Sequence, residues 1–128
     1  MEVTPRHFKS RGKQKMKSLW KFAKCLDEMR KLDPEIQAQT ISCFVVVAMN
    51  PGITMKDIGE RVGISQASTS RNIAALSKVH RLNRPGHDLV VATEDPVERR
   101  RKVVHLTDKG KLVVESLRMI MEPEATAS

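Results

Sequence analysis

The amino-acid sequence predicts a mainly α-helical fold with one small β-hairpin, and three observations support this expectation. Apolar side chains recur at helical spacing along most of the chain. Two β-rich segments, residues 89–93 and 101–106, flank a polar stretch that contains a proline, and this pattern is typical of a hairpin. A length of 128 residues is enough for one domain with a real core. We therefore expect a single domain over residues 13–121.

Residues 1–12 are expected to form a basic, flexible arm that precedes this domain. The chain from residue 3 to residue 24 carries eight lysines and arginines and no acidic side chain. The first dozen residues also contain little that a core could bury. Such an arm could lie along phosphates or in a minor groove, and a merely solubilising role explains its composition equally well.

The first helix is expected over residues 13–32, because apolar side chains follow a 3.6-residue period there. Its apolar stripe includes Leu19, Trp20 and Leu26. Trp20 is the only tryptophan of a chain without tyrosine, so its burial should matter. We expect this stripe to form a dimer interface, and the alternative is an intramolecular core.

A second helix is expected to start at Asp33-Pro34-Glu35 and to end near Met49. Asp caps the first amides of a helix, Pro fits its first position, and Glu complements its dipole. The later part of this helix is apolar nearly all round, so it should be the central core helix, although three consecutive valines would also suit a buried strand. Ile53 follows the helix breakers and is expected to pair as a short strand.

Residues 53–80 are expected to form two short helices joined by a tight turn, which is a helix-turn-helix. Thr54 followed three residues later by Asp57 resembles a capping box. Gly63 is expected to end the first helix, because a residue without a Cβ adopts the left-handed conformation at little cost. Ser65 is then placed to cap the second helix.

The outward face of this second helix is small and hydrogen-bonding, with one arginine, one amide and no acidic side chain. Such a face suits insertion into the major groove of DNA, and an ordinary helical hairpin with a solvated face is the alternative. Gln66 and Arg71 are candidates for base contacts, because an amide can pair with adenine and a guanidinium with guanine. The candidate DNA-binding residues here are Ser65, Gln66, Ala67, Ser68, Ser70 and Arg71.

The hairpin over residues 88–106 is expected to form a wing beside the helix-turn-helix. Its tip carries three consecutive arginines, Arg99, Arg100 and Arg101, which are further candidates for DNA contacts.

The last helix is expected over residues 107–121, opened by Thr107-Asp-Lys-Gly. Its apolar stripe includes Leu117 and Ile120, which we assign to the dimer interface together with the first helix. Residues 122–128 offer nothing to bury and are expected to be a disordered tail.

The charge balance favours a polyanionic partner. The chain holds 23 Lys plus Arg against 15 Asp plus Glu, a formal net charge of +8. This balance does not distinguish DNA from RNA or an anionic membrane. No apolar run is long enough for a secretory signal or a membrane span, and there are only two cysteines, so we expect a cytoplasmic protein with reduced thiols and no membrane partner.

The sequence gives no indication of metal, cofactor or enzymatic chemistry. The four histidines are scattered, and none has ligand spacing with a cysteine or carboxylate. No nucleophile, base and orienting group converge. Cys25 could have a lowered pKa beside Lys21 and Lys24, which would permit an oxidant switch, and the alternative is a small buried side chain.

The order of elements is that of a winged helix, and several strings resemble the MarR family of transcriptional regulators. Residues 50–54, Asn-Pro-Gly-Ile-Thr, resemble that family's loop before the helix-turn-helix. Residues 58–65 with Ser70-Arg71 resemble its recognition motif, and residues 98–110 resemble its wing and the start of the next helix. The resemblance covers residues 35–117.

This resemblance implies that Arg100 enters a minor groove and that Glu98 orients it. It also implies that the recognition helix reads a major groove. The chain departs from the family by several additional residues between Leu76 and the wing, centred on residues 82–89, so the hairpin is expected to be displaced or enlarged. The terminal helices are also short for a family whose effector pocket adjoins the dimer interface, so a small-molecule effector is left open.

We therefore expect a homodimeric, sequence-specific regulator of transcription that binds double-stranded DNA and acts as a repressor. Two-fold symmetry predicts a roughly palindromic operator with half-sites about one helical turn apart. An alternative is a nonspecific nucleic-acid-binding or assembly module, for example in replication or partition. Another is a ligand- or oxidant-responsive version of the regulator.

Overall fold

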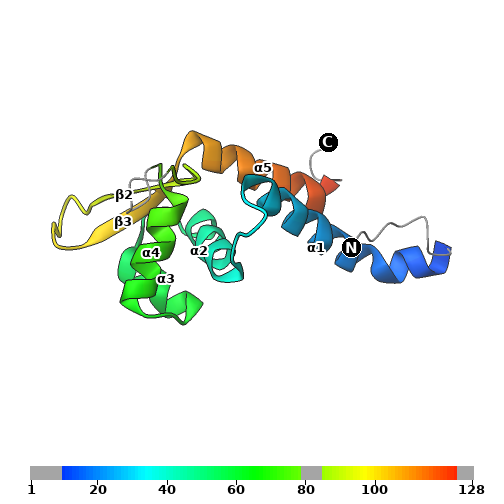
Figure 1. The fold of residues 1–128 in the computed structure, drawn as a ribbon, viewed down its shortest axis with the longest axis horizontal. Coiled ribbons are helices and arrows are strands. Elements are labelled where there is room, and N and C mark those ends of the chain that lie inside the picture. Colours follow the sequence, from blue (N-terminus) through cyan, green and yellow to red (C-terminus); the bar gives the residue numbers. More distant parts are fainter. Residues whose placement is uncertain (1–9, 79–84, 124–128) are drawn as a thin grey trace. The chain divides into compact units, whose positions relative to one another are not determined.

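A computed structural model describes residues 10–78 and 85–123 (Figure 1). The chain forms two compact units. One unit holds the residues up to Glu35 together with those from Glu115 onward, and the other is Ile36–Val114. The predicted arm before residue 10 and the tail from residue 124 lie outside the described residues.

The first unit is built on helix α1, Ser10–Leu32. The predicted helix is confirmed, but it begins at Ser10, so residues 10–12 are helical and do not belong to the arm. The last part of helix α5, Asp108–Met121, belongs to the same unit. Lys21 Nζ donates to the carbonyl of Met121 over 3.0 Å, which joins the two helices.

The predicted start of the second helix at Asp33 is wrong, because helix α2 covers Ala38–Met49. The Asp33 carboxylate accepts a hydrogen bond from the amide of Glu35 over 2.9 Å. The carbonyl of Pro34 accepts one from Arg30 Nε over 3.2 Å. Aspartate side chains can satisfy an amide two residues on, and here that local bond makes a turn in place of a helix cap.

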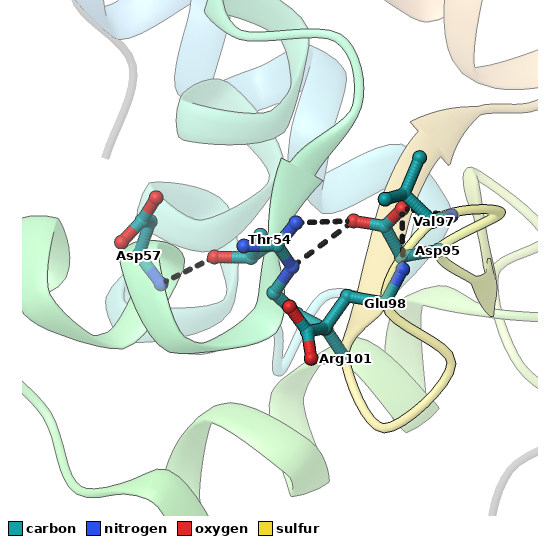
Figure 2. Close-up of polar contacts among 6 residues, drawn as sticks. All are labelled: Thr54, Asp57, Asp95, Val97, Glu98 and Arg101. Carbon is teal, nitrogen blue, oxygen red and sulfur yellow. Dashed lines mark hydrogen bonds and ion pairs between the residues drawn. The ribbon is translucent and has the colours of Figure 1, made fainter.

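The helix-turn-helix is confirmed as helices α3, Met55–Val62, and α4, Gln66–Leu76. Thr54 Oγ1 accepts from the amide of Asp57 over 3.1 Å (Figure 2), and Ser65 Oγ accepts from the amide of Ser68 over 3.1 Å. Gly63 has φ +82°, in the left-handed region that ends a helix. Each of these signals is local, so the sequence pattern predicted it directly.

Helix α2 is the central core helix of the second unit, as predicted. Its Phe44 and Val47 are fully buried, as are Ile58 of α3 and Leu76 of α4. Helices α3 and α4 approach closely at Gly59. A Cβ on Gly59 would lie 2.6 Å from Thr69 Oγ1, so a larger residue would push the two helices apart.

A three-stranded antiparallel sheet attaches the hairpin to the helix-turn-helix. Its strands are β1 (Ile53–Thr54), β2 (Val90–Glu94) and β3 (Lys102–Leu106), in the order β1-β3-β2. Val104 is fully buried in the central strand, opposite Ile53 on one side and Ala92 on the other. The wing is therefore fixed to the residues that immediately precede α3.

The link between α4 and the wing is packed where the structure describes it, from residue 85 onward. The amide of His87 donates to the carbonyl of Ala75, and that of Leu89 donates to Leu76. The Leu89 side chain is fully buried. A Cβ on Gly86 would lie 1.8 Å from the carbonyl oxygen of Ser77, so only glycine fits this approach. These contacts tie the base of the wing to the end of α4.

None of the helices in the described part of the chain is long and apolar enough to cross a membrane.

Candidate nucleic-acid interface

The start of α4 and the wing line a common groove of about 330 Å³. Helix α4 contributes Gln66 and Ser70, both predicted from the sequence, and the wing contributes two of its predicted arginines. The groove contains four cationic side chains and no acidic one. Its lining residues are Met55, Lys56, Gln66, Ser70, Arg100, Arg101 and Lys102.

The predicted reading face of α4 lies on the outside of the unit. Gln66, Ala67, Ser70 and Arg71 are exposed, as is the capping Ser65. Ser68 is half-buried, and its hydroxyl accepts a hydrogen bond from Arg71 Nη2 over 3.0 Å. The first turn of α4 has no acidic residue, so the positive end of its dipole is available to an anion.

The wing tip is held by Asp95, a residue that the sequence analysis did not single out. One carboxylate oxygen accepts from the amide of Val97 over 2.9 Å. The other accepts from Arg101 Nε over 3.0 Å and Arg101 Nη2 over 2.7 Å (Figure 2). The amide of Val97 and then the guanidinium of Arg101 lower the pKa of Asp95 from its ordinary value of 3.8. An aspartate before Pro96 was the available signal, since such residues favour turns.

The expected role of Glu98 as the partner that orients Arg100 stays a prediction. No side-chain interaction joins the two residues in the part of the wing that the structure describes. Glu98 contributes its backbone, because its carbonyl accepts from the amide of Arg101 over 2.9 Å. Arg101 is the arginine that is held, because its Nε and Nη2 both donate to Oδ2 of Asp95, whereas Glu98 is exposed to solvent. Arg99 and Arg100 are exposed as well.

A second residue that sequence reasoning missed is Asn72, on the side of α4 opposite the reading face. Its side chain is 7% exposed and bonds to Thr40 and Gln39 of α2. The available signal was an amide side chain on the side of α4 that carries Thr69, Ile73 and Leu76. Asn72 fixes α4 to the core helix.

The predicted dimerisation residues are accessible in the single chain. Leu19 is 62% exposed and Leu26 36%, while Trp20, Leu117 and Ile120 are half-buried. The Lys24 ammonium lies 5.7 Å from the centre of the Trp20 ring, as in a cation–π contact. Phe22 is 58% exposed on the same helix and was not predicted.

The expectation that lysines could lower the pKa of Cys25 is wrong. Burial and the nearby carboxylate of Glu28 raise the pKa of its thiol. The fully buried Cys43 also has a raised pKa, because burial disfavours its thiolate. A reactive cysteine usually has a lowered pKa, so neither thiol has this property. Across residues 10–78 and 85–123, no cluster of three metal-ligating side chains is present.

Residues 47–78 match the family of winged helix-turn-helix DNA-binding domains. This segment holds the end of α2, β1, α3 and α4. No curated protein has a sequence that matches this chain.

Solved structures with the same fold include two that are bound to DNA. MepR of Staphylococcus aureus in complex with DNA is 19% identical, with a TM-score of 0.67 over 88% of this chain and 85% of that one. The transcriptional repressor CouR bound to a 23-mer duplex is 21% identical, with a TM-score of 0.59 over 94% of this chain and 78% of that one.

The PcaV transcriptional regulator of Streptomyces coelicolor, in complex with its natural ligand, is 20% identical with a TM-score of 0.53. The match covers 70% of this chain and 63% of that chain, so this chain spans less than two thirds of its length.

These similarities confirm the predicted fold. The chain has a winged helix-turn-helix fold, which it shares with MepR, CouR and MarR. The low sequence identities establish the fold alone.

Proposed function

We propose that this chain is a sequence-specific regulator of transcription that binds double-stranded DNA and acts as a repressor. The observation that carries this proposal is the groove in which the recognition helix and the wing meet. It places an amide and a hydroxyl beside Lys56, Arg100, Arg101 and Lys102. Winged helix-turn-helix regulators of this fold have been solved bound to DNA, which supports the proposal. Such a protein acts in the cytoplasm, beside its DNA.

The two sides of the groove suit different parts of a duplex. The exposed face of α4 is small, and Gln66 and Arg71 can pair with base edges in a major groove. The adjacent cations are suited to phosphates, which carry much of the affinity of DNA-binding proteins. The exposed Arg100 on the wing is the candidate for a minor groove.

A homodimer completes this proposal, because one recognition helix reads only one half of a palindromic site. The exposed apolar side chains of α1, among them Leu19, Phe22 and Leu26, are available to a second copy. Leu117 and Ile120 of α5 are half-buried in the single chain and can add to the same interface.

Duplex binding at several salt concentrations tests the role of the groove. The logarithm of the affinity should fall linearly with the logarithm of salt concentration, and Arg100→Ala should reduce the magnitude of the slope by about 1. Lys111→Ala on α5, outside the groove, is the matched control and should leave the slope unchanged. Equal slopes for the Arg100→Ala variant and the parent would remove the wing from the interface, and a parent that binds no duplex would contradict the proposal as a whole.

A further inference from the structure

Asn72 makes three side-chain hydrogen bonds at the contact between α4 and α2. Its Nδ2 donates to the Ser68 carbonyl over 2.8 Å and to Gln39 Oε1 over 2.9 Å. Its Oδ1 accepts from the Thr40 hydroxyl over 2.7 Å. The Ser68 carbonyl can only accept, so the amide nitrogen must face it and the orientation of the Asn72 side chain is determined.

This polar cluster, composed of Gln39, Thr40 and Asn72, is placed where it controls the position of α4. Thr40 and Asn72 are 6% and 7% exposed, whereas Gln39 is exposed at the rim. Most other buried side chains of the two helices are apolar, among them Phe44, Val47 and Leu76. Apolar surfaces tolerate small slides and rotations, but a buried directional hydrogen bond is satisfied in only one register.

The cluster reaches the reading face through Ser68. The Ser68 carbonyl accepts from Asn72, while its hydroxyl accepts from Arg71 Nη2 over 3.0 Å. Arg71, the candidate for a guanine contact, therefore precedes Asn72 in the chain, and both side chains bond to Ser68. A bidentate base contact depends on the angle and depth of the helix in the groove, and small displacements of such groups are costly.

We infer that Asn72, with Thr40 and Gln39, is a positioning cluster that sets the register of the recognition helix and thereby the base selectivity of the protein. This inference rests on the proposed function. It assigns selectivity to residues that face away from the DNA, and it leaves the phosphate-directed part of the affinity to the cations of the groove.

The deciding variant is the double change Thr40→Val and Asn72→Leu. It replaces both buried polar partners by apolar groups of similar size, a change that is often nearly neutral for stability. Gln39 is exposed, so water can satisfy its amide after the change. The stability of the variant should therefore stay close to that of the parent, while the register of α4 is no longer fixed.

The measurement compares affinity for a duplex that the parent selects from a random pool with affinity for duplexes changed at single base pairs. Each mismatch is expected to weaken parent binding by about 5–150-fold. In the double variant, this ratio of affinities for the preferred and the mismatched duplex should be about tenfold smaller. Its affinity for unrelated duplex should change by less than about threefold, because the phosphate contacts are kept.

Two further variants separate positioning from a merely structural role. Thr40→Ser keeps the hydroxyl and should retain the discrimination of the parent. Ser77→Ala removes a hydrogen bond at the end of α4, from Ser77 Oγ to the Ile73 carbonyl. This variant should also retain the discrimination of the parent. Gln39→Ala removes one hydrogen bond of the cluster at an exposed site, so this variant should fold even if the double variant does not. The ratio of its affinities for the preferred and the mismatched duplex should fall by about threefold.

Unchanged discrimination in the double variant would overturn the inference. If the double variant fails to fold, unchanged discrimination in Gln39→Ala overturns it instead. A parent that prefers no sequence would overturn the proposed function and this inference with it. A parent with a clear preference that the variants share would overturn the inference alone.

Discussion

Asp95 gives the wing tip its shape, because one carboxylate binds both the backbone of the turn and the side chain of Arg101, the residue before β3. Its oxygens accept from the amide of Val97 and from two nitrogens of Arg101. Arg101 lines the groove, so the turn and one cation of the candidate interface depend on the same charged group.

The ionisation of Asp95 should be visible in the pH dependence of the wing. Its pKa is lowered in the folded chain, so its contribution to stability is complete above the ordinary value of 3.8 and is lost as the pH falls through the lowered pKa. We expect the nuclear magnetic resonance signals of the Val97 amide and the Arg101 Nε–H to stay constant through neutral pH and to shift below about pH 4. Asp95→Asn should abolish that transition, and Glu94→Gln should preserve it. A transition in the parent above pH 5 would contradict this assignment.

Arg71 is the residue whose loss should change selectivity most directly. Arg71→Ala removes the only guanidinium of the reading face, and we expect a loss of about 1–3 kcal/mol at the preferred duplex, with relaxed selectivity at one base pair. Titration of duplexes that carry all four base pairs at each position measures both effects. Lys111→Ala controls for the loss of a positive charge. An unchanged preference would show that Arg71 does not contact a base.

At the scale of the elements, the helix-turn-helix depends on one close approach between its two helices. Gly59 faces Thr69, and an added Cβ would lie 2.6 Å from the Thr69 hydroxyl and 3.3 Å from the Ile64 carbonyl. The approach sets the distance between α3 and α4, and so it also sets how far α4 projects from the core.

Gly59→Ala should therefore destabilise the chain by about 1–3 kcal/mol, as overpacking does. Gly63→Ala is the comparison, because it meets no atom within 4 Å and adds only the strain of a left-handed residue, about 1 kcal/mol. Denaturant unfolding measures both. Combining Gly59→Ala with Thr69→Ala should cost less than the sum of the single changes, since the contact is removed. Strict additivity would show that the contact does not limit the packing.

The sequence predicted the elements whose signals are local and missed the contacts between distant residues. The caps Thr54 and Ser65 and the left-handed Gly63 each depend on neighbours within a few positions, so their chemistry is visible in the sequence. Asp33 has equally suitable neighbours, but a turn competed with the helix for its carboxylate.

In the candidate site, too, residues with local signals were predictable and residues held by distant partners were not. Gln66 and Ser70 could be placed on one side of a helix by periodicity alone. The partner of Asn72 is Thr40, which is 32 positions away, and no local pattern indicates that pair. Asp95 and Arg101 are closer, but only the folded turn shows that Arg101, and not Arg100, binds a carboxylate.

At the scale of the whole molecule, the proposed homodimer would use the exposed apolar side chains of α1. Leu19 and Phe22 of α1 are 62% and 58% exposed, which is a large apolar surface for side chains at helical spacing. Burying such side chains against a second copy gives about 1.5–3 kcal/mol each.

A charge on this surface should prevent association. Leu19→Asp with Phe22→Asp should raise the dimer dissociation constant by about tenfold or more, because it loses apolar burial and buries two carboxylates. Analytical ultracentrifugation at several concentrations measures this constant. Met49→Asp, at a side chain that is 73% exposed on α2, is the matched control and should leave association unchanged. A parent that is monomeric at every concentration, with and without duplex, would contradict the dimer.

Selection of bound duplexes from a random pool measures whether the chain reads the sequence of a DNA duplex. We predict enrichment of an inverted repeat whose half-sites lie about one helical turn apart. Enrichment of no sequence, together with binding that falls steeply as salt increases, would contradict sequence-specific binding and would identify the chain as a nonspecific nucleic-acid-binding module.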